Sequence, residues 1–273
     1  MRSASRRART SLREHQASVL ESRASVATLT RVAEELYAVG DLLVGQARLR
    51  RTLGDPATAG EARETLVGTL FDGKVSKQTL AIVKAAVTER WSSPWDLADA
   101  VEGAGDDALF QAAEKDGALD GVEDELFRFE RILQAAGDLT GLLDEFSASV
   151  VRRTELLDTL LDGKVSPLTI ALLRHAVASQ RKRSITLAID DLLEQAAARQ
   201  ERSVARVISA VPLSDEQEDR LAMALSDTYG RAISVRTALD PRVRGGLIVR
   251  VGDEVIDGSI AARIAGARTL MAG

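Results

Sequence analysis

The sequence predicts a mainly α-helical protein, in which two related helical-bundle modules precede a small α+β C-terminal domain. Three observations lead to this prediction. Aromatic residues make up only 3% of the 273 residues, a segment of the chain recurs further along it, and the hydrophobic period changes near residue 204. Because aromatic side chains are few, aliphatic residues and alanine must fill the cores, and this favours closely packed helices over a β-sandwich.

An internal repeat is the clearest of these signals. Residues 71–76 read FDGKVS and residues 161–166 read LDGKVS. Further identical pairs in the same register are Glu35 and Glu125, Leu36 and Leu126, Leu66 and Leu156, Thr79 and Thr169, Ala86 and Ala176, and Leu97 and Leu187. Self-similarity at a fixed period is typical of a duplicated structural unit. We therefore expect a helical module that occurs twice.

Apolar residues within the repeat recur at the spacing of an α-helix. Four of them fall on one helix face: Val122, Leu126, Phe129 and Leu133. Ser166 and Pro167 suit a helix start, because serine caps the first turn and proline needs no amide hydrogen at the first helical position. We expect an extra N-terminal helical module over residues 1–104 and a second helical domain over residues 105–202.

Strand patterns begin in the last part of the chain, which we assign to a small α+β domain at residues 203–273. The β-branched residues between Val204 and Val211 favour a strand. Ser214 and Gln217 then fit a capping box, in which each side chain bonds the backbone N–H of the other residue at a helix start. This helix should end near residue 230.

Two further strands are predicted in this domain, at residues 233–239 and 247–251, because apolar residues alternate strictly in both. Gly252-Asp253 is typical of a two-residue hairpin turn with glycine first. Apolar residues at helical spacing from Ile260 to Ala267 predict a last amphipathic helix.

The segment Gly68–Lys74 fits the G-x-x-x-x-G-K core of a phosphate-binding loop, but its context does not. Val75 stands where the motif needs a hydroxyl for magnesium, and the preceding residues have a helical pattern where a strand is required. In the second copy Asp158 replaces the first glycine, and its carboxylate would repel phosphate. We interpret the segment as the end of a helix, with Gly73 as its left-handed cap.

Composition excludes several kinds of site. The chain has no cysteine, which removes thiolate nucleophiles, disulfides and cysteine-ligated metals. Its two histidines, His15 and His175, are too few for a histidine-rich metal site, and His175 lies in an apolar helix, as a structural histidine would. We expect no catalytic, cofactor-binding or metal-binding residues.

Charge and hydropathy narrow the class of partner. The formal net charge of −5 argues against a nucleic-acid-binding protein, which usually has a strongly basic face. The compact basic cluster Arg181–Arg183 suits a solvated helix end. No apolar run approaches the roughly eighteen residues that a membrane helix needs, so we do not expect the chain to span a bilayer.

Two segments resemble the delta subunit of the F-type ATP synthase, the bacterial counterpart of the oligomycin-sensitivity-conferring protein. Residues 108–117, ALFQAAEKDG, with VEDEL at 122–126, are similar to the opening helices of that family's N-terminal domain. The second segment is more specific and holds, in the family's order, Asp240-Pro241, Gly245-Gly246, Gly252-Asp253 and Asp257-Gly258-Ser259. The resemblance covers about residues 105–270, and a chain extended by residues 1–104 resembles the delta subunits of actinobacteria.

The resemblance implies a non-catalytic stator subunit of the peripheral stalk, which needs no cofactor. It would link the top of the catalytic alpha/beta head to the membrane-anchored b subunit, at the cytoplasmic face of the cell membrane. The implied partners are the N-terminal helices of the alpha subunits, the beta subunits and the b subunit, with no nucleic acid. The alternatives are a helical regulatory or RNA-binding adaptor and a nucleotide-hydrolysing enzyme, the latter resting only on Gly68–Lys74.

The resemblance also implies two sets of site residues. A groove for an alpha-subunit helix would lie between residues 108–115 and 167–180, because an amphipathic helix binds where two helices leave an apolar channel. Its predicted lining is Leu109, Ala113, Leu168 and Leu172. The C-terminal signature, predicted to set turn geometry on the side of the b subunit, is Asp240, Pro241, Gly245, Gly246, Gly252, Asp253, Asp257 and Ser259.

Overall fold

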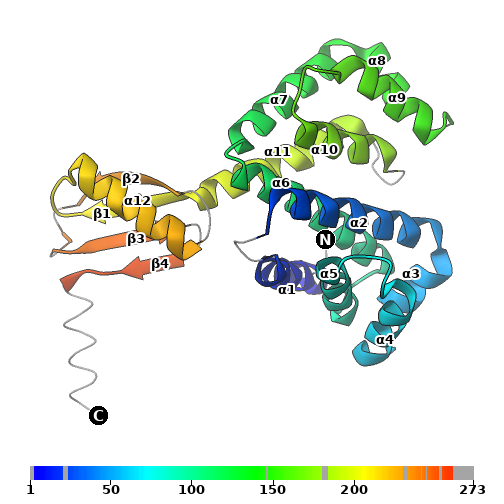
Figure 1. The fold of residues 1–273 in the computed structure, drawn as a ribbon, viewed down its shortest axis with the longest axis horizontal. Helices are drawn as coiled ribbons and strands as arrows, with labels where there is room; N and C mark the ends of the chain where they lie inside the picture. Colours follow the sequence, from blue (N-terminus) through cyan, green and yellow to red (C-terminus); the bar gives the residue numbers. More distant parts are fainter. Residues whose placement is uncertain are drawn as a thin grey trace. The chain divides into compact units, whose positions relative to one another are not determined.

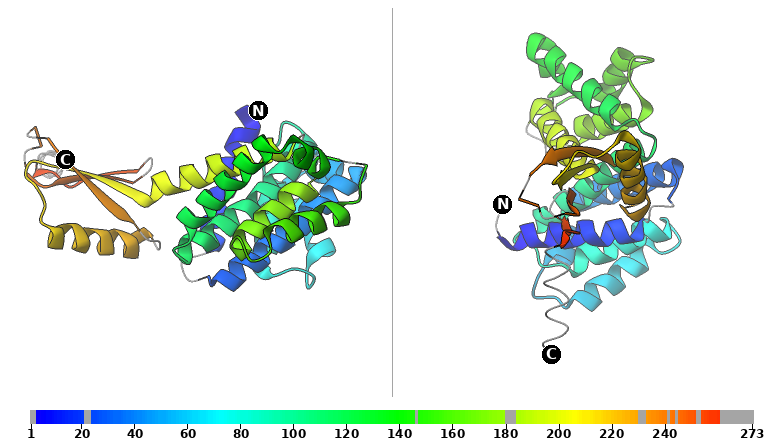
Figure 2. Two further views of the ribbon diagram at one scale, coloured as in Figure 1. Left: turned by 90° about the horizontal axis from the view of Figure 1, so that it is seen from above. Right: turned by 90° about the vertical axis from the view of Figure 1, so that its left-hand side faces the viewer.

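The computed structural model describes residues 3–20, 24–145, 147–179, 184–229, 233–240, 242–243, 245–251 and 254–260. These residues form twelve helices and one four-stranded sheet, divided between two compact units, Met1–Leu193 and Glu194–Gly273. The described elements of the first unit are helices, and the sheet lies in the second (Figure 1, Figure 2). The predicted class, mainly α with a small α+β C-terminal region, is confirmed.

The helices of the first unit are mostly short and closely connected. They are α1 (Ser3–Val19), α2 (Val26–Gly45), α3 (Ala47–Gly54), α4 (Gly60–Phe71), α5 (Lys77–Thr88), α6 (Pro94–Lys115), α7 (Leu119–Ala135), α8 (Gly137–Leu143), α9 (Val150–Leu161) and α10 (Pro167–Ala178), with α11 (Ile185–Ser203) running on into the second unit. A serine caps the N-terminus of α2, α5, α9 and α10. Its hydroxyl oxygen accepts a hydrogen bond from the backbone N–H three residues further along the chain. The helix start expected at Ser166 and Pro167 is therefore confirmed.

The internal repeat of the sequence is also a repeat of helices. A shift of 90 residues carries the bounds of α4 onto those of α9, and the bounds of α5 onto those of α10. By the same shift α1 corresponds to the first part of α6, and α6 in turn corresponds to α11. Helix α6 therefore ends the first repeat and begins the second, and the boundary expected between residues 104 and 105 falls inside it.

Each repeat contains the same interaction, a glutamate carboxylate that accepts hydrogen bonds from the start of a neighbouring helix; we call it the carboxylate clamp. In the first, Glu35 of α2 accepts hydrogen bonds from the Ser76 backbone N–H at 2.8 Å and the Thr79 hydroxyl at 2.6 Å, both at the start of α5. In the second, Glu125 of α7 accepts from the Ser166 N–H and the Thr169 hydroxyl at the start of α10. A carboxylate at a helix N-terminus also interacts favourably with the helix dipole, so each clamp fixes one long helix against the fifth helix of its repeat.

In each repeat a buried arginine donates hydrogen bonds to carbonyl groups at the C-terminal ends of two helices. Arg63 of α4 donates to the carbonyl oxygens of Leu53 and Glu89, which lie at the C-terminal ends of α3 and α5. Its counterpart Arg153 of α9 donates to those of Leu143 and Val177, at the ends of α8 and α10. Terminal carbonyls lack helical partners, and a cation there is favoured by the dipole. Both arginines are almost fully buried, so this polar interaction is part of each core.

The second unit is a four-stranded sheet with one helix packed on it. Its elements are β1 (Val204–Ser209), α12 (Asp215–Tyr229), β2 (Ser234–Leu239), β3 (Leu247–Val251) and β4 (Glu254–Asp257). The strand order is β2-β1-β3-β4, with β1 and β2 parallel and the other two pairs antiparallel. The Ser214 N–H donates to Gln217 Oε1 and the Gln217 N–H donates to Ser214 Oγ, which confirms the predicted capping box.

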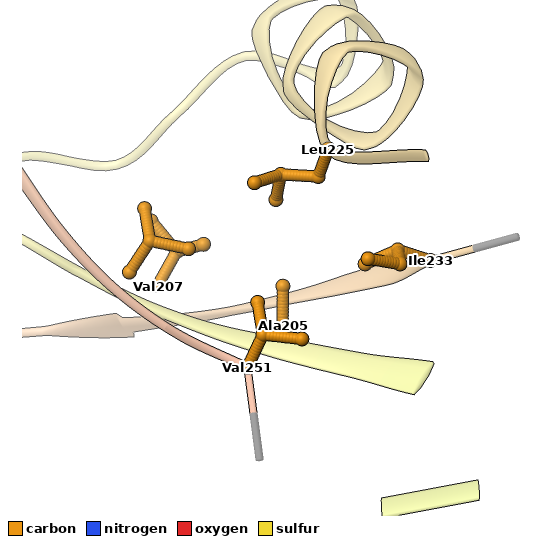
Figure 3. Close-up of a cluster of buried hydrophobic side chains, with 6 residues drawn as sticks. Ala205, Val207, Leu225, Ile233 and Val251 are labelled. Carbon is orange, nitrogen blue, oxygen red and sulfur yellow. The ribbon is translucent and has the colours of Figure 1, made fainter. Parts of the chain in front are cut away.

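The core of this unit lies between α12 and one face of the sheet. Figure 3 shows Leu225 of α12 above the side chains of the strands and of Ile233. The buried cluster is Ala205, Val207, Leu225, Ile233, Val249 and Val251. Alternation along β1 and β3 then turns the intervening residues to the opposite face. The predicted alternating strands are thus confirmed, and one of their faces is the core.

Several expectations lie outside the described residues. They concern Pro241, Gly252, Asp253, the cluster Arg181–Arg183 and the last helix beyond Ile260. Val251 of β3 pairs with Glu254 of β4, which is the register that a two-residue connection between them requires.

The clamp of the first repeat makes stability depend on pH. Burial alone would raise the pKa of Glu35, but the hydrogen bonds from Ser76, Thr79 and Arg31 outweigh it and lower that pKa to about 2. A lowered pKa contributes stability above the usual value of 4.5, and the contribution is lost as the pH falls towards 2. We predict that Glu35→Gln lowers the free energy of unfolding at pH 7 by about 1–3 kcal/mol, the range of hydrogen bonds to a charged group.

Urea unfolding followed by circular dichroism between pH 7 and pH 2.5 measures this effect. The difference between wild type and Glu35→Gln should shrink as the pH falls below about 5. The control is Glu34→Gln, a neighbouring exposed glutamate on the same helix, which should unfold like wild type throughout. A constant difference across the pH range would contradict the role of the charge.

In the turn before β3, glycine is required more strictly at position 246 than at position 245. Gly245 and Gly246 both have positive φ, of 71° and 79°. A Cβ on Gly246 would lie 2.4 Å from the backbone oxygen of Gly258, whereas one on Gly245 would meet only the end of the Ile260 side chain. We predict that Gly246→Ala destabilises the second unit by at least about 2 kcal/mol and that Gly245→Ala costs about 1 kcal/mol. Amide hydrogen exchange of β1 and β3 measures both, and equal effects would contradict the backbone clash.

Candidate partner-binding surfaces

The Gly68–Lys74 segment has the geometry of a helix end and not of a phosphate-binding loop. Residues up to Phe71 belong to α4, and the Asp72 N–H donates to the Gly68 carbonyl as in a helix. Gly73 follows with φ of 70°, and its counterpart Gly163 has φ of 64°. The same turn thus ends α4 and α9, as the left-handed cap interpretation predicted.

A buried polar cluster joins the two repeats. The Tyr37 ring of α2 stacks on the His175 ring of α10, with centroids 3.7 Å apart and planes 10° from parallel. The Tyr37 hydroxyl donates to Asp106 Oδ1 at 2.8 Å, and His175 Nε2 lies 3.9 Å from Glu102 Oε2. Burial, with the nearby Asp106 carboxylate, raises the pKa of Tyr37 well above its usual value, so the phenol stays a proton donor. His175 is structural, as predicted, and it contacts a helix of the other repeat.

Two glycines make this close packing of α2 and α6 possible. A Cβ on Gly105 would lie 2.5 Å from Tyr37 Cε1, and one on Gly40 would lie 2.8 Å from Glu102 Cγ. Such distances leave no room for a methyl group. Sequence analysis missed Tyr37, Glu102 and Asp106, because residues so far apart in the chain show no local pattern.

The residues predicted to line a helix-binding groove lie on α6 and α10, which pack against each other. Leu109 and Ala113 come from α6, and Leu168 and Leu172 come from α10. All four side chains are buried within the chain, with Leu168 the most exposed at 8%. Because all four are buried by the chain itself, the structure shows no open groove lined by these side chains.

The described part of the C-terminal signature gathers at one end of the sheet. The Gly258 N–H donates to Leu247 O, the Ile260 N–H donates to Gly245 O, and the Ser259 N–H donates to Asp257 Oδ1. The hydrogen bonds from Ser259 lower the pKa of Asp257. At the other turn the Arg242 side chain and N–H donate to Asp240 and lower the pKa of that carboxyl. These residues shape turns, and they hold the end of β2 and the start of β3.

The face of the sheet opposite α12 carries a pair of like charges. Arg206 of β1 and Arg250 of β3 are directly opposite each other in the antiparallel register, and both are exposed. Like charges on neighbouring strands destabilise a sheet. The arrangement suits an acidic partner, and the sequence could not reveal it because it depends on strand register.

Exposed apolar side chains lie along the edge of the same unit. Val255 and Ile256 of the edge strand β4 are 50% and 42% exposed, and Ile260 follows at 51%. An exposed edge strand also offers unpaired backbone groups to a partner. Val255 pairs with Arg250 and so lies on the face of the arginine pair, whereas Ile256 pairs with Val249 on the face of α12. The arginine face therefore has both basic and apolar character.

Neither a metal-binding cluster nor a membrane-spanning helix is present in the described ranges. Within them, no three His, Asp or Glu side chains come together in a way that could hold a metal ion. In the part of the chain described here, every helix is too short or too polar to cross a membrane.

Comparison with known proteins identifies a family. The family described as ATP synthase delta (OSCP) subunit matches residues 107–271, close to the span over which the sequence resembled it. A protein of Streptomyces griseus named ATP synthase subunit delta is 42% identical over 273 residues, covering all of both chains. Proteins of the same name from Rhodococcus opacus and Corynebacterium aurimucosum are 42% and 41% identical, covering 98% and 100% of each chain.

A solved structure also contains a similar chain. It is titled a cryo-EM structure of the Toxoplasma gondii mitochondrial ATP synthase hexamer, and the similar chain is 25% identical. The alignment covers 62% of this chain and 95% of that chain, with a TM-score of 0.28, which is too low to carry a structural argument. The family match over residues 107–271 and the 42% identity over the full length show that the chain belongs to the ATP synthase delta (OSCP) subunit family.

Proposed function

We propose that this chain is a non-catalytic stator subunit of the peripheral stalk, which links the top of the catalytic alpha/beta head to the membrane-anchored b subunit. The observation that carries the proposal is the presence of two compact units with different surfaces in a member of the delta subunit family. A stator must hold the head still while the rotor turns. Two separate binding surfaces are enough for that task, and no cofactor is needed.

The helical unit is the proposed contact with the head. The pair formed by α6 and α10, with Leu109, Ala113, Leu168 and Leu172 beneath it, is the proposed seat for an N-terminal helix of an alpha subunit. Helix-in-groove binding uses apolar anchors on one face of the bound helix. The beta subunits would be neighbours of this contact.

The α+β unit is the proposed contact with the b subunit. Arg206 and Arg250 supply positive charge, and Val255, which pairs with Arg250 on the same face, supplies apolar surface at an edge strand. The signature residues Asp240, Gly245, Gly246, Asp257 and Ser259 would act indirectly, by shaping the turns that border this surface. The chain would thus be attached peripherally at the cytoplasmic face of the membrane, through b.

The alternative of a helical regulatory or RNA-binding adaptor unrelated to ATP synthase has less support. Membership of the delta subunit family argues against it. The nucleotide-hydrolysing alternative rested on Gly68–Lys74, and this segment is a helix end and not a phosphate-binding loop.

Charge reversal on the sheet tests the contact with b. We predict that Arg206→Glu/Arg250→Glu, in the tagged full-length chain, lowers recovery of b from detergent-solubilised membranes roughly tenfold. The alpha and beta subunits should be recovered as with wild type. Because the reversal replaces one like-charged pair by another, the sheet itself should keep a similar stability.

Quantitative mass spectrometry of the co-purified subunits measures the outcome. The matched control is Arg220→Glu, an exposed arginine on α12 at the other side of the sheet, which should leave b recovery unchanged. Equal loss of b in the control would contradict the assigned surface. Failure of wild type to recover alpha, beta and b would overturn the stator role.

A further inference from the structure

The buried cluster between the repeats is charged at positions where other copies of the module are apolar. A shift of 90 residues carries Glu102 onto Leu12 in one direction and onto Leu192 in the other, and both leucines are buried. The same shift carries His175 onto Ala85. The fold of the module therefore does not require a carboxylate or an imidazole at these positions. Because burying charged groups costs free energy, their presence at the contact between the repeats indicates a purpose other than packing.

Glu102 of α6 and His175 of α10 face each other inside the helical unit. Their side chains belong to residues only 4% and 8% exposed, and His175 Nε2 lies 3.9 Å from Glu102 Oε2. This is ion-pair distance once the imidazole carries a second proton. His175 also lies in the last turn of α10, where the helix dipole favours a positive charge. A proton on the ring therefore strengthens this contact, although burial by itself opposes the charge.

Two further carboxylates lie near the ring, one on α2 and one on α6. Asp41 of α2 interacts electrostatically with His175; burial raises the pKa of this carboxyl, and the charge of His175 acts in the opposite direction. Asp106 of α6 accepts the hydrogen bond of the Tyr37 hydroxyl, and the Tyr37 ring stacks on the imidazole. With Glu102, three carboxylates thus favour a positive charge on the ring.

Helices α7 and α9 also pack against α10. Glu125 of α7 binds the N-terminal end of α10, the end opposite His175. Asp158 of α9 is paired with an arginine of α10. Arg153 of α9 donates to a carbonyl oxygen in the last turn of α10, and its guanidinium opposes a second positive charge there. One guanidinium therefore opposes the proton on the imidazole, and three carboxylates favour it.

We propose that Glu102 and His175 form a pH-dependent latch between the two repeats, which is closed when the His175 ring is protonated. Histidine is the side chain whose charge normally changes between pH 5 and pH 8. A proton that is bound more tightly in the closed form stabilises that form at low pH, and this contribution is lost as the pH rises. The latch lies inside the helical unit and does not depend on the proposed stator role.

The latch acts in a different pH range from the carboxylate clamp. The contribution of Glu35 is lost below about pH 5, whereas the latch should weaken as the pH rises from 6 to 8. Tyr37 stays protonated over this range, because burial and the Asp106 carboxylate raise its pKa well above the usual value of 10.0. The ring stacking on His175 therefore persists while the charge of the imidazole changes.

Amide hydrogen exchange of the full-length chain at pH 6 and pH 8 tests the latch. After correction for the intrinsic pH dependence of exchange, the amides of α10 should be protected roughly tenfold more at pH 6 than at pH 8, as expected when closure changes the proton affinity of one group by about one pH unit. Glu102→Gln keeps the shape of the side chain and removes its charge, so it should abolish this difference. The amides of α12, which contains no histidine, should show no such difference in either protein.

The second histidine of the chain provides the matched control. The sequence contains only His15 and His175, so each gives one resolvable imidazole signal in an NMR titration. The His175 signal, assigned by its loss in His175→Gln, should titrate at lower pH in Glu102→Gln than in wild type. His15 is exposed on α1, so His15→Gln should leave the His175 signal and the protection of α10 unchanged.

A second substitution at position 102 guards the test against misfolding. Glu102→Leu introduces the residue found at both related positions, so it should fold and show the same α10 protection at pH 6 and pH 8. Equal protection at the two pH values in wild type would overturn the latch. So would a difference that survives in both position 102 variants, or one that disappears in His15→Gln.

Discussion

Both helical repeats depend on the burial of one helix, α6. A surface helix buries a single stripe, but α6 packs against α2 and α3 of the first repeat and against α7 and α10 of the second. Its buried residues accordingly lie on more than one face and include Leu97, Ala98, Val101, Ala104, Ala108, Leu109, Phe110, Ala112 and Ala113. The many alanines let neighbouring backbones approach. Because the helix belongs to both repeats, the two repeats form one compact unit.

Because α6 is shared by the two repeats, polar side chains are buried on it, and the two repeats differ at corresponding positions. Close packing on α6 encloses Glu102 and Asp106, and buried polar groups must find partners there. Tyr37 and His175 supply them, one from each repeat. The Tyr37 ring lies against Gly105 of α6 and His175 of α10, whereas the residues at the corresponding positions of the first repeat, His15 and Ala85, line an open cavity. The two copies of the module therefore differ at these corresponding positions.

In the α+β unit, the register of the strands determines which side chains face the core and which face away from it. Alternation places Ala205, Val207, Val249 and Val251 against α12 (Figure 3). The same alternation brings Arg206 and Arg250 opposite each other on the far face. A sheet that stabilises one face with a core leaves the other free to select a partner by charge. Such surfaces suit an adaptor in a larger assembly.

Sequence patterns were sufficient to predict the fold class, the duplicated module, the helix caps at Ser166 and Ser214, the alternating strands and the helix-ending role of Gly73. These features depend on local spacing and backbone preference, which a sequence displays directly. The folded structure was needed to show that α6 serves both repeats, that Tyr37 stacks on His175, that Leu109 and Leu172 are buried, and that two arginines face each other. Those facts depend on contacts between residues far apart in the chain, and packing of that kind leaves no periodic signal to read.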